Sequence, residues 1–325
     1  MPFKEIFWQD SAIALLKASY QNNRLAHAYL CVGPSGVGKK KVVTNFTKLL
    51  FCDKRNSDGA CGVCPSCLKI ESNSHADVYW IEPDGQNIRI DAVREVCRRL
   101  SLKGFESSRK VLVVDQAQCL SEESSSALLK TLEEPSLNTV IFLLADSIKS
   151  VLPTIVSRCQ RVMFSSLPET VLAQVLTERF RVDSKDALYC ARIAQGSMGE
   201  AVKFCENGLS SRKNEIIKNF LSKSCPLDKC LEVFSGKKAD KPDNRQELLS
   251  VLLSWFRDIL LAKAALPEDC FINADSKDEI LRLSSSFSLD DIINRIASIA
   301  EASIEKKHNI NMRVSLAKLR VDLWK

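Results

Sequence analysis

The sequence predicts an α/β domain with a parallel sheet up to about residue 165 and a purely helical region after it. In the first part, short apolar segments alternate with amphipathic helical patterns, and this alternation is typical of a parallel sheet. After Pro168 the strand-like segments stop, and apolar periodicity of helical type becomes strong between Leu248 and Leu260. With 325 residues, the chain is long enough for two or three domains.

Five segments have strand character because each is short and rich in Val, Ile, Leu or Phe. They are residues 28–32, 78–81, 111–114, 139–144 and 161–164. Helical patterns fill the gaps at residues 39–51, 91–100, 122–133 and 150–157. We expect three domains, namely the α/β domain at 1–165, a small helical lid at 166–207 and a separate helical domain at 208–325.

The composition is that of a globular protein, with 45% hydrophobic and 26% charged residues. The longest apolar runs fall far short of the roughly 20 residues that cross a bilayer, so we expect no membrane span. The first residues lack the features of a secretory signal, which predicts a cytoplasmic protein. A net charge of +6 permits contact with nucleic acid or an acidic partner without deciding between them.

A glycine-rich loop directly follows the first predicted strand and precedes a helix. Its residues are Gly33, Pro34, Ser35, Gly36, Val37, Gly38, Lys39 and Lys40. The glycines let backbone N–H groups converge on phosphate oxygens, the start of the helix adds a favourable dipole, and Lys39 would reach the terminal phosphates. The pattern predicts a phosphate-binding loop (P-loop) for ATP, the alternative being a plain glycine turn.

Two positions depart from an active P-loop site. Lys40 stands where a Ser or Thr hydroxyl would bind Mg²⁺, and an ammonium group has no lone pair to offer the metal. Asp115 ends the third strand as a metal-supporting carboxylate would, but Gln116 follows it and cannot accept a proton from water. We expect impaired hydrolysis, whether or not nucleotide binds. The alternative for Asp115 is a cap on the loop after a core strand.

Four of the thirteen cysteines cluster within one short stretch, at Cys52, Cys61, Cys64 and Cys67. Four thiolates at this spacing suit tetrahedral Zn²⁺, and a full set of sulfur ligands leaves no open position, which indicates a structural site. A redox or disulfide arrangement and unliganded thiols are the alternatives. His75 could replace Cys52 as a ligand, although a lone surface histidine is the more common case.

Three further segments make the chain resemble the clamp-loader subunits of bacterial DNA polymerase III, a branch of the AAA+ ATPases. They are residues 25–30, 127–135 and 152–160, taken together with the P-loop and the inserted cysteines. The resemblance is specific up to residue 207 and looser beyond. It implies an AAA+ domain with an inserted zinc module, a helical lid and a C-terminal all-helical collar domain that joins the subunits of a ring.

Within that family, the departures resemble the non-hydrolysing delta-prime type rather than the ATP-hydrolysing motor subunits of the gamma/tau type, which are the alternative. Lys40 replaces the metal-binding hydroxyl, Gln116 replaces a glutamate, and Gly199 stands where motor subunits carry an arginine that senses the γ-phosphate. A chain ending at Lys325 also agrees with the expected delta-prime type, because motor subunits commonly carry long C-terminal extensions. The resemblance implies partners of the motor and delta types, a sliding clamp and primed DNA.

The triplet Ser157, Arg158 and Cys159 matches a family motif whose arginine acts on ATP held by the neighbouring subunit. The resemblance therefore makes Arg158 an arginine finger, and arginine is well suited to stabilise charge on a transferring phosphate. The alternative is that Arg158 bonds the last carbonyl groups of the preceding helix. An independent kinase or nucleic-acid-binding protein would leave this triplet unexplained.

Basic residues gather around the helix expected at 91–100. They are Arg89, Arg94, Arg98, Arg99, Lys103, Arg109 and Lys110. A solvated helix face is the default interpretation, and contact with DNA phosphates is the other.

Overall fold

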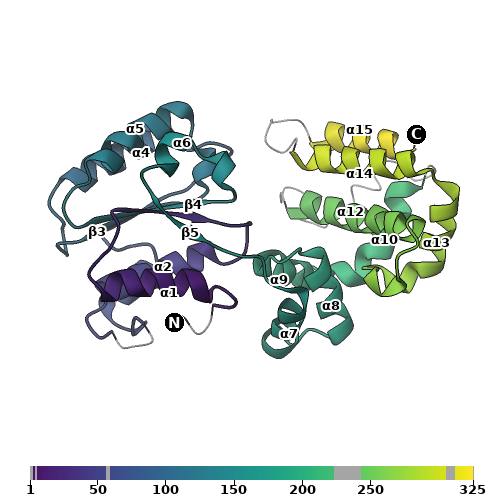
Figure 1. Ribbon diagram of the computed structural model, residues 1–325, viewed down its shortest axis with the longest axis horizontal. Helices are drawn as coiled ribbons and strands as arrows, with labels where there is room; N and C mark the ends of the chain where they lie inside the picture. The colour runs from purple at the N-terminus through teal and green to yellow at the C-terminus, as the bar shows by residue number, and fades with distance from the viewer. Residues whose placement is uncertain (1–2, 4–5, 56–58, 223–242, 305–311, 325) are drawn as a thin grey trace. The chain divides into compact units, whose positions relative to one another are not determined.

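The computed structural model describes residues 3, 6–55, 59–222, 243–304 and 312–324 (Figure 1). The chain divides into two compact units, Met1–Leu167 and Pro168–Lys325. The division falls where the strand-like segments of the sequence stop.

The first unit is built on one sheet in which all paired strands run parallel. Its strands are β1 (Ala28–Val32), β2 (Val78–Ile81), β3 (Lys110–Val114), β4 (Thr139–Ala145) and β5 (Gln160–Met163). Their order across the sheet is β2-β3-β4-β1-β5, so the P-loop strand β1 lies between β4 and β5. The predicted parallel α/β fold is confirmed, with every strand within one residue of its expected bounds.

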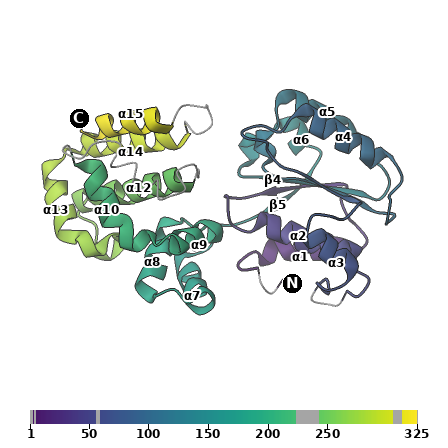
Figure 2. The same cartoon turned by 180° about the vertical axis from the view of Figure 1, so that it is seen from behind.

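Helices cover both faces of this sheet (Figures 1 and 2). One face carries α1 (Asp10–Gln21), α2 (Lys39–Phe51) and α3 (Pro65–Glu71), and the other carries α4 (Ile90–Ser101), α5 (Glu122–Glu133) and the short α6 (Pro153–Val156). The sequence patterns predicted α2, α4 and α5 closely. They did not predict α1 or α3.

The central strands are buried on both faces, which explains their unbroken apolar sequence. On one face, Leu30 and Ile141 belong to a core cluster with Leu128 of α5. On the other face, Tyr29 and Phe142 stack with ring centroids 5.3 Å apart, and Phe46 of α2 meets Phe142 edge-on at 5.9 Å. This packing fixes α2, and therefore the P-loop before it, against the sheet.

The described part of the second unit consists of helices. They are α7 (Glu169–Phe180), α8 (Ser184–Ile193), α9 (Met198–Glu206), α10 (Leu209–Leu221), α12 (Asp243–Lys263), α13 (Lys277–Ser286), α14 (Leu289–Ile304) and α15 (Met312–Trp324), with short 3-10 turns at Glu268–Cys270 and Ala274–Ser276. The apolar face of α12 predicted from the sequence is buried, including Leu252, Trp255 and Phe256. Among the described helices, none has the length and apolar character needed to span a bilayer.

A buried carboxylate organises the end of the sheet opposite the P-loop. Asp77, which precedes β2, is fully buried and accepts N–H hydrogen bonds from Phe105 (2.6 Å), Glu106 (2.7 Å) and Ser107 (2.8 Å). Its carbonyl accepts a further bond from the N–H of Val111 in β3 (3.0 Å). Asp77 therefore fastens the loop that leads into β3 and aligns the starts of β2 and β3.

We expect the variant Asp77→Ala to lower the free energy of unfolding by roughly 3 kcal/mol, because charge-assisted hydrogen bonds are lost and their backbone donors stay partly buried. Urea denaturation measures this loss. Asp84→Ala is the matched control, since its ion pair with Arg89 has side chains about 70% exposed and such pairs contribute little. Equal stability of the two variants would contradict the role of Asp77.

Candidate nucleotide and metal sites

The backbone path of the loop after β1 requires glycine at two positions. A Cβ atom on Gly33 would lie 2.4 Å from the carbonyl oxygen of Phe164, so only glycine fits beside β5. Gly38 has a φ of +103° immediately before α2, a left-handed conformation that side chains disfavour. Pro34, Ser35 and Gly36 are exposed, so the outer side of the loop is open to solvent.

The first lysine of α2 is folded onto its own loop. Lys39 is buried, and its Nζ donates to the carbonyl oxygens of Gly33 and Pro34, the latter at 2.9 Å. It also forms an ion pair with Asp146, 2.9 Å away at the end of β4. The ammonium group thus lies at the loop, where a P-loop lysine is expected, and a carboxylate balances its charge.

The second lysine lies between two carboxylates at the carboxyl end of the sheet. The Nζ atom of Lys40 pairs closely with Glu82, lies 3.4 Å from Asp115 Oδ2 and lies 5.3 Å from the centroid of the Trp80 ring. Partial burial alone would lower the pKa of Lys40, but hydrogen bonds and charge from Glu82 and Asp115 outweigh this and raise it. Lys40 is therefore a fixed cation in this site.

A Mg²⁺ ion, which the P-loop fold implies, does not fit this set of residues. Position 40 offers an ammonium group instead of a hydroxyl oxygen, and that group already holds Asp115 and Glu82. A divalent ion would have to displace the ammonium from both carboxylates and then remain close to its charge. Asp115 therefore lies where the sequence predicted it, but as the partner of a lysine.

Two acidic residues of the site were not identified from the sequence. Glu82 directly follows β2, and Asp146 directly follows β4, so both lie at the same edge of the sheet as Asp115. Gln118 donates to the second oxygen of Asp146 at 3.0 Å. The signal that singled out Asp115, a carboxylate one residue after a buried parallel strand, would have found Glu82 and Asp146 as well. Gln116 is exposed, with a φ of +54°.

The four clustered cysteines come together in space. The Sγ atoms of Cys52, Cys61, Cys64 and Cys67 all lie within 4.8 Å of one another. Cys52 follows the end of α2, and Cys64 caps the start of α3, where Pro65 opens the helix. The cluster therefore links the two helices, and an ion pair between Lys48 and Glu71 links them as well.

Backbone N–H groups point at the sulfur atoms, which favours thiolates. The N–H of Cys61 donates to Cys52 Sγ, and that of Cys64 donates to Cys61 Sγ, both at 3.3 Å. Bonds from the backbone of Val63 and Cys64 lower the pKa of Cys61 to about 6. Burial raises the pKa of Cys52 and Cys67, which are the sulfurs that most need a bound cation to ionise. The donor set fits a metal ion held by four thiolates.

His75 is not a member of this cluster, and it is not a surface residue. It is buried, its ring lies 4.6 Å from that of Phe51 between centroids, and its Nδ1 accepts the N–H of Asp77 at 3.2 Å. The expectation of a lone surface histidine is wrong, because a ring adjacent to an apolar helix end gains more from packing than from solvent. Burial lowers the pKa of His75.

Arg158 lies after α6 and is partly exposed. Its Nη1 donates to the carbonyl oxygen of Thr154 at 2.9 Å, and its Nη2 lies 2.6 Å from Glu133 Oε1 at the end of α5. The first contact is the helix-end bond considered as the alternative to an arginine finger. Both contacts are made by a partly exposed side chain, and neither requires the guanidinium to be buried.

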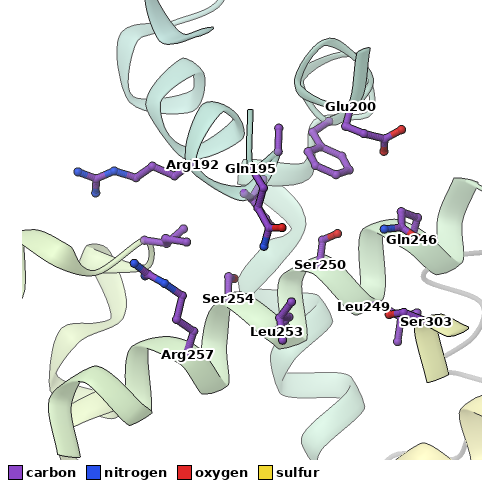
Figure 3. Close-up of a pocket in the computed structure, with 14 residues that line it drawn as sticks. Arg192, Gln195, Glu200, Gln246, Leu249, Ser250, Leu253, Ser254, Arg257 and Ser303 are labelled. Carbon is purple, nitrogen blue, oxygen red and sulfur yellow. The ribbon is translucent and has the colours of Figure 1, made fainter. Parts of the chain in front are cut away.

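In the second unit, Gly199 lies in the first turn of α9, and with no side chain it cannot reach a phosphate. A pocket of about 140 Å³ lies nearby between α8, α9 and α12 (Figure 3). Two of its arginines bind consecutive backbone carbonyl groups in the segment after α12. Arg192 donates to the carbonyl of Phe271 at 2.9 Å, and Arg257 donates to that of Cys270 at 3.1 Å. These arginines stabilise the unit.

The basic residues around α4 are largely engaged within the protein. Arg98 and Arg99 both pair with Glu95, at 3.0 and 2.7 Å. Lys110 is buried and donates to the carbonyl groups of Leu100 and Leu102, so it belongs to neither a solvated face nor a phosphate-binding surface. The sequence analysis placed Lys110 among the basic residues around α4, but strand β3 begins one residue earlier than expected and includes Lys110.

Comparison with known proteins gives concordant matches to subunits of DNA polymerase III. Residues 8–168 match a family model described as DNA polymerase III, delta subunit, and residues 207–320 match one for its C-terminal part. The chain is 28% identical over 319 residues to DNA polymerase III subunit delta' of Bacillus subtilis, covering 94% of this chain and 93% of that protein. It is 30% identical over 249 residues to the delta' subunit of Escherichia coli, covering 76% and 74%. A tau/gamma subunit of Haemophilus influenzae is 32% identical over 226 residues, covering 68% of this chain and 33% of that protein.

The buried His75 predicts a pH-dependent contribution to stability. Its pKa in the folded state lies below the ordinary value of 6.5, so the unfolded chain binds the proton more strongly. The contribution is complete above pH 6.5 and is lost as the pH falls from there through the lowered pKa. We expect His75→Gln to remove this component. Urea denaturation of both proteins between pH 5 and 7.5 should show the unmodified chain losing more stability than the variant, whereas parallel curves would contradict the assignment.

Proposed function

Since the chain belongs to the family of DNA polymerase III delta' subunits, we propose that it serves as a non-hydrolysing subunit of the clamp loader, the ring that uses ATP to place a sliding clamp on primed DNA. The observation that carries this proposal is the pairing of Lys40 with Asp115 and Glu82, which fills the metal position of the P-loop with a side chain. A subunit built in this way supports a ring whose ATP is hydrolysed elsewhere.

The second candidate is an ATP-hydrolysing motor subunit, which the match to a tau/gamma subunit favours. Three positions in the sequence argue against it. Lys40 supplies no oxygen for Mg²⁺, Gln116 supplies no base, and Gly199 supplies no arginine for the γ-phosphate. Because each change removes a different part of the hydrolytic machinery, a delta' role accounts for all of them.

Within the loader, we assign residues 208–325 to the collar that joins this subunit to its neighbours and residues 166–207 to a lid between the collar and the α/β domain. The partners are loader subunits of the motor and delta types, with the clamp and primed DNA engaged by the ring as a whole. This work takes place in the cytoplasm.

The four-cysteine cluster holds Zn²⁺ in a structural role. Support comes from the number and type of ligands, since four thiolates within reach of one ion suit Zn²⁺ and leave no position for a reacting water. The ion would supply charge neutralisation and a fixed link between α2 and α3. Because α2 begins at the P-loop, the metal also steadies that loop.

We expect one zinc ion per purified chain, and we expect the double variant Cys61→Ser/Cys64→Ser to contain almost none and to unfold at a lower temperature. Inductively coupled plasma mass spectrometry and thermal unfolding measure the two effects. The double variant Cys97→Ser/Cys270→Ser is the control, because both of its thiols lie outside the cluster. Full zinc occupancy without Cys61 and Cys64 would refute the assignment.

Arg158 acts as a finger on ATP held by the neighbouring subunit. Its partial exposure supports this role, as does the nature of its two contacts, which a phosphate could replace without leaving a buried charge unpaired. A planar guanidinium can span two phosphate oxygens, and lysine cannot reproduce that geometry. The finger would stabilise charge that develops on the γ-phosphate during hydrolysis by the motor subunit.

In a reconstituted loader, Arg158→Ala should lower DNA-stimulated ATPase activity and clamp loading. The one ATP site that faces Arg158 should lose about 10³-fold or more in rate, so the total activity falls only in part. Arg158→Lys should restore little. Arg161→Ala is the matched control, since Arg161 is an exposed arginine on the adjacent strand β5.

Two results would separate the finger from the helix-end role of Arg158. If the variant complex assembles and loads clamps at the unmodified rate, the finger role is wrong. If Arg158→Ala instead unfolds the isolated chain in thermal denaturation, the bond to Thr154 at the end of α6 is what the arginine provides.

A further inference from the structure

The acidic edge of the sheet next to the P-loop is neutralised by the protein itself. Glu82 and Asp115 end neighbouring strands, and the N–H of Asp115 bonds the carbonyl of Ile81 at 2.9 Å, so the two carboxylates are held side by side. Two adjacent carboxylates repel each other unless a cation lies between them. Lys40 provides that cation, with Nζ bonded to Glu82 and 3.4 Å from Asp115.

Lys40 still has the capacity to bind a phosphate. An ammonium group carries three donors, and Glu82 and Asp115 together use two of them. The side chain is 47% exposed and begins at the first turn of α2, directly beside the loop. Its third donor is therefore available to an oxygen of a phosphate chain bound along the loop, while the other two remain on the carboxylates.

The loop retains what phosphate binding needs apart from the metal. Gly33, Gly36 and Gly38 keep the tight backbone path, and no described side chain caps the start of α2. Lys39 is bonded to carbonyl groups and to the half-exposed Asp146, partners that phosphate oxygens can replace. Pro34 and Ser35 are exposed, which leaves the approach to the loop open.

We propose that this loop binds a nucleoside polyphosphate without a divalent metal ion, with the Lys40 ammonium, held by Glu82 and Asp115, in place of Mg²⁺. The single charge of Lys40 links the acidic edge of the sheet to the phosphate chain, as a metal ion does in other P-loop sites. Unlike a metal ion, the ammonium group activates no water. The bound nucleotide is retained rather than hydrolysed. The proposal rests on the same pairing of Lys40 that supports the loader role, but clamp loading does not require a nucleotide in this loop, so the two can fail separately.

Calorimetric titration of the full-length chain with ATP, in EDTA and separately in Mg²⁺, tests the proposal. Binding in EDTA with an affinity within about twofold of that in Mg²⁺ supports it. Binding that requires Mg²⁺, or no binding in either buffer, overturns it. Neither negative result bears on the loader role, because clamp loading by a complex containing the unmodified chain is measured separately.

The variant Lys40→Thr reverses the arrangement by restoring a hydroxyl group and releasing the carboxylates. Its affinity for ATP in EDTA should fall by about 10- to 100-fold, since a charged hydrogen bond is lost, and Mg²⁺ should recover it. Electron paramagnetic resonance with Mn²⁺ and ATP should detect a bound metal ion in the variant and none in the unmodified chain. Lys41→Thr is the matched control, with an exposed lysine one position further on, and should behave as unmodified. Metal-independent binding by Lys40→Thr would refute the role of Lys40.

Discussion

The parallel alignment of the five strands is the constraint on which the sites of the first unit depend. Because every paired strand runs in the same direction, their carboxyl ends meet at one edge. The residues that follow four of these strands are Gly33, Glu82, Asp115 and Asp146. The sheet therefore brings together a phosphate loop and three carboxylates that are far apart in sequence. This arrangement requires neither long loops nor a ligand that orders them.

Much of this architecture could be predicted because its signals are local. A strand buried on both faces reads as an unbroken apolar run, and residues 139–144 are such a run. Helix α1 was missed because it precedes the first strand, so no alternation of strand and helix points to it. In addition, only one narrow side of α1 is buried, at Ala12, Ile13 and Leu16. Helix α3 was missed because it is short and begins inside the cysteine stretch, whose pattern suggested a metal loop and hid the helical one.

The sequence could not predict which side chains form pairs at the edge of the sheet, and the reason is a different one. The motif identifies Lys40 as the wrong residue type for a metal site, but only the tertiary structure brings Glu82, which follows β2, within reach of the Lys40 ammonium group in α2. The same holds for Asp146 beside Lys39, since β4 and β1 are neighbours in space and not in sequence. The cysteines are the opposite case. Their short spacing already confines the sulfurs to a small volume, so the cluster was foreseen in full, while the buried position of His75 depended on packing against Phe51.

The charge arrangement explains how a P-loop can lack a metal-binding side chain and still keep its fold. Removing a metal-binding hydroxyl alone would leave Glu82 and Asp115 adjacent with no cation between them, and their repulsion would act on the ends of two core strands. A lysine at position 40 removes the metal ligand and supplies the missing charge in a single substitution. The sheet edge is then balanced in the absence of any ligand, with Lys39 on Asp146 and Lys40 on the other two carboxylates. Such a domain can keep one conformation through a cycle of ATP binding and hydrolysis in other subunits. The role proposed for Arg158 requires a rigid support from which the guanidinium acts on a neighbour's phosphate, and that constancy favours it.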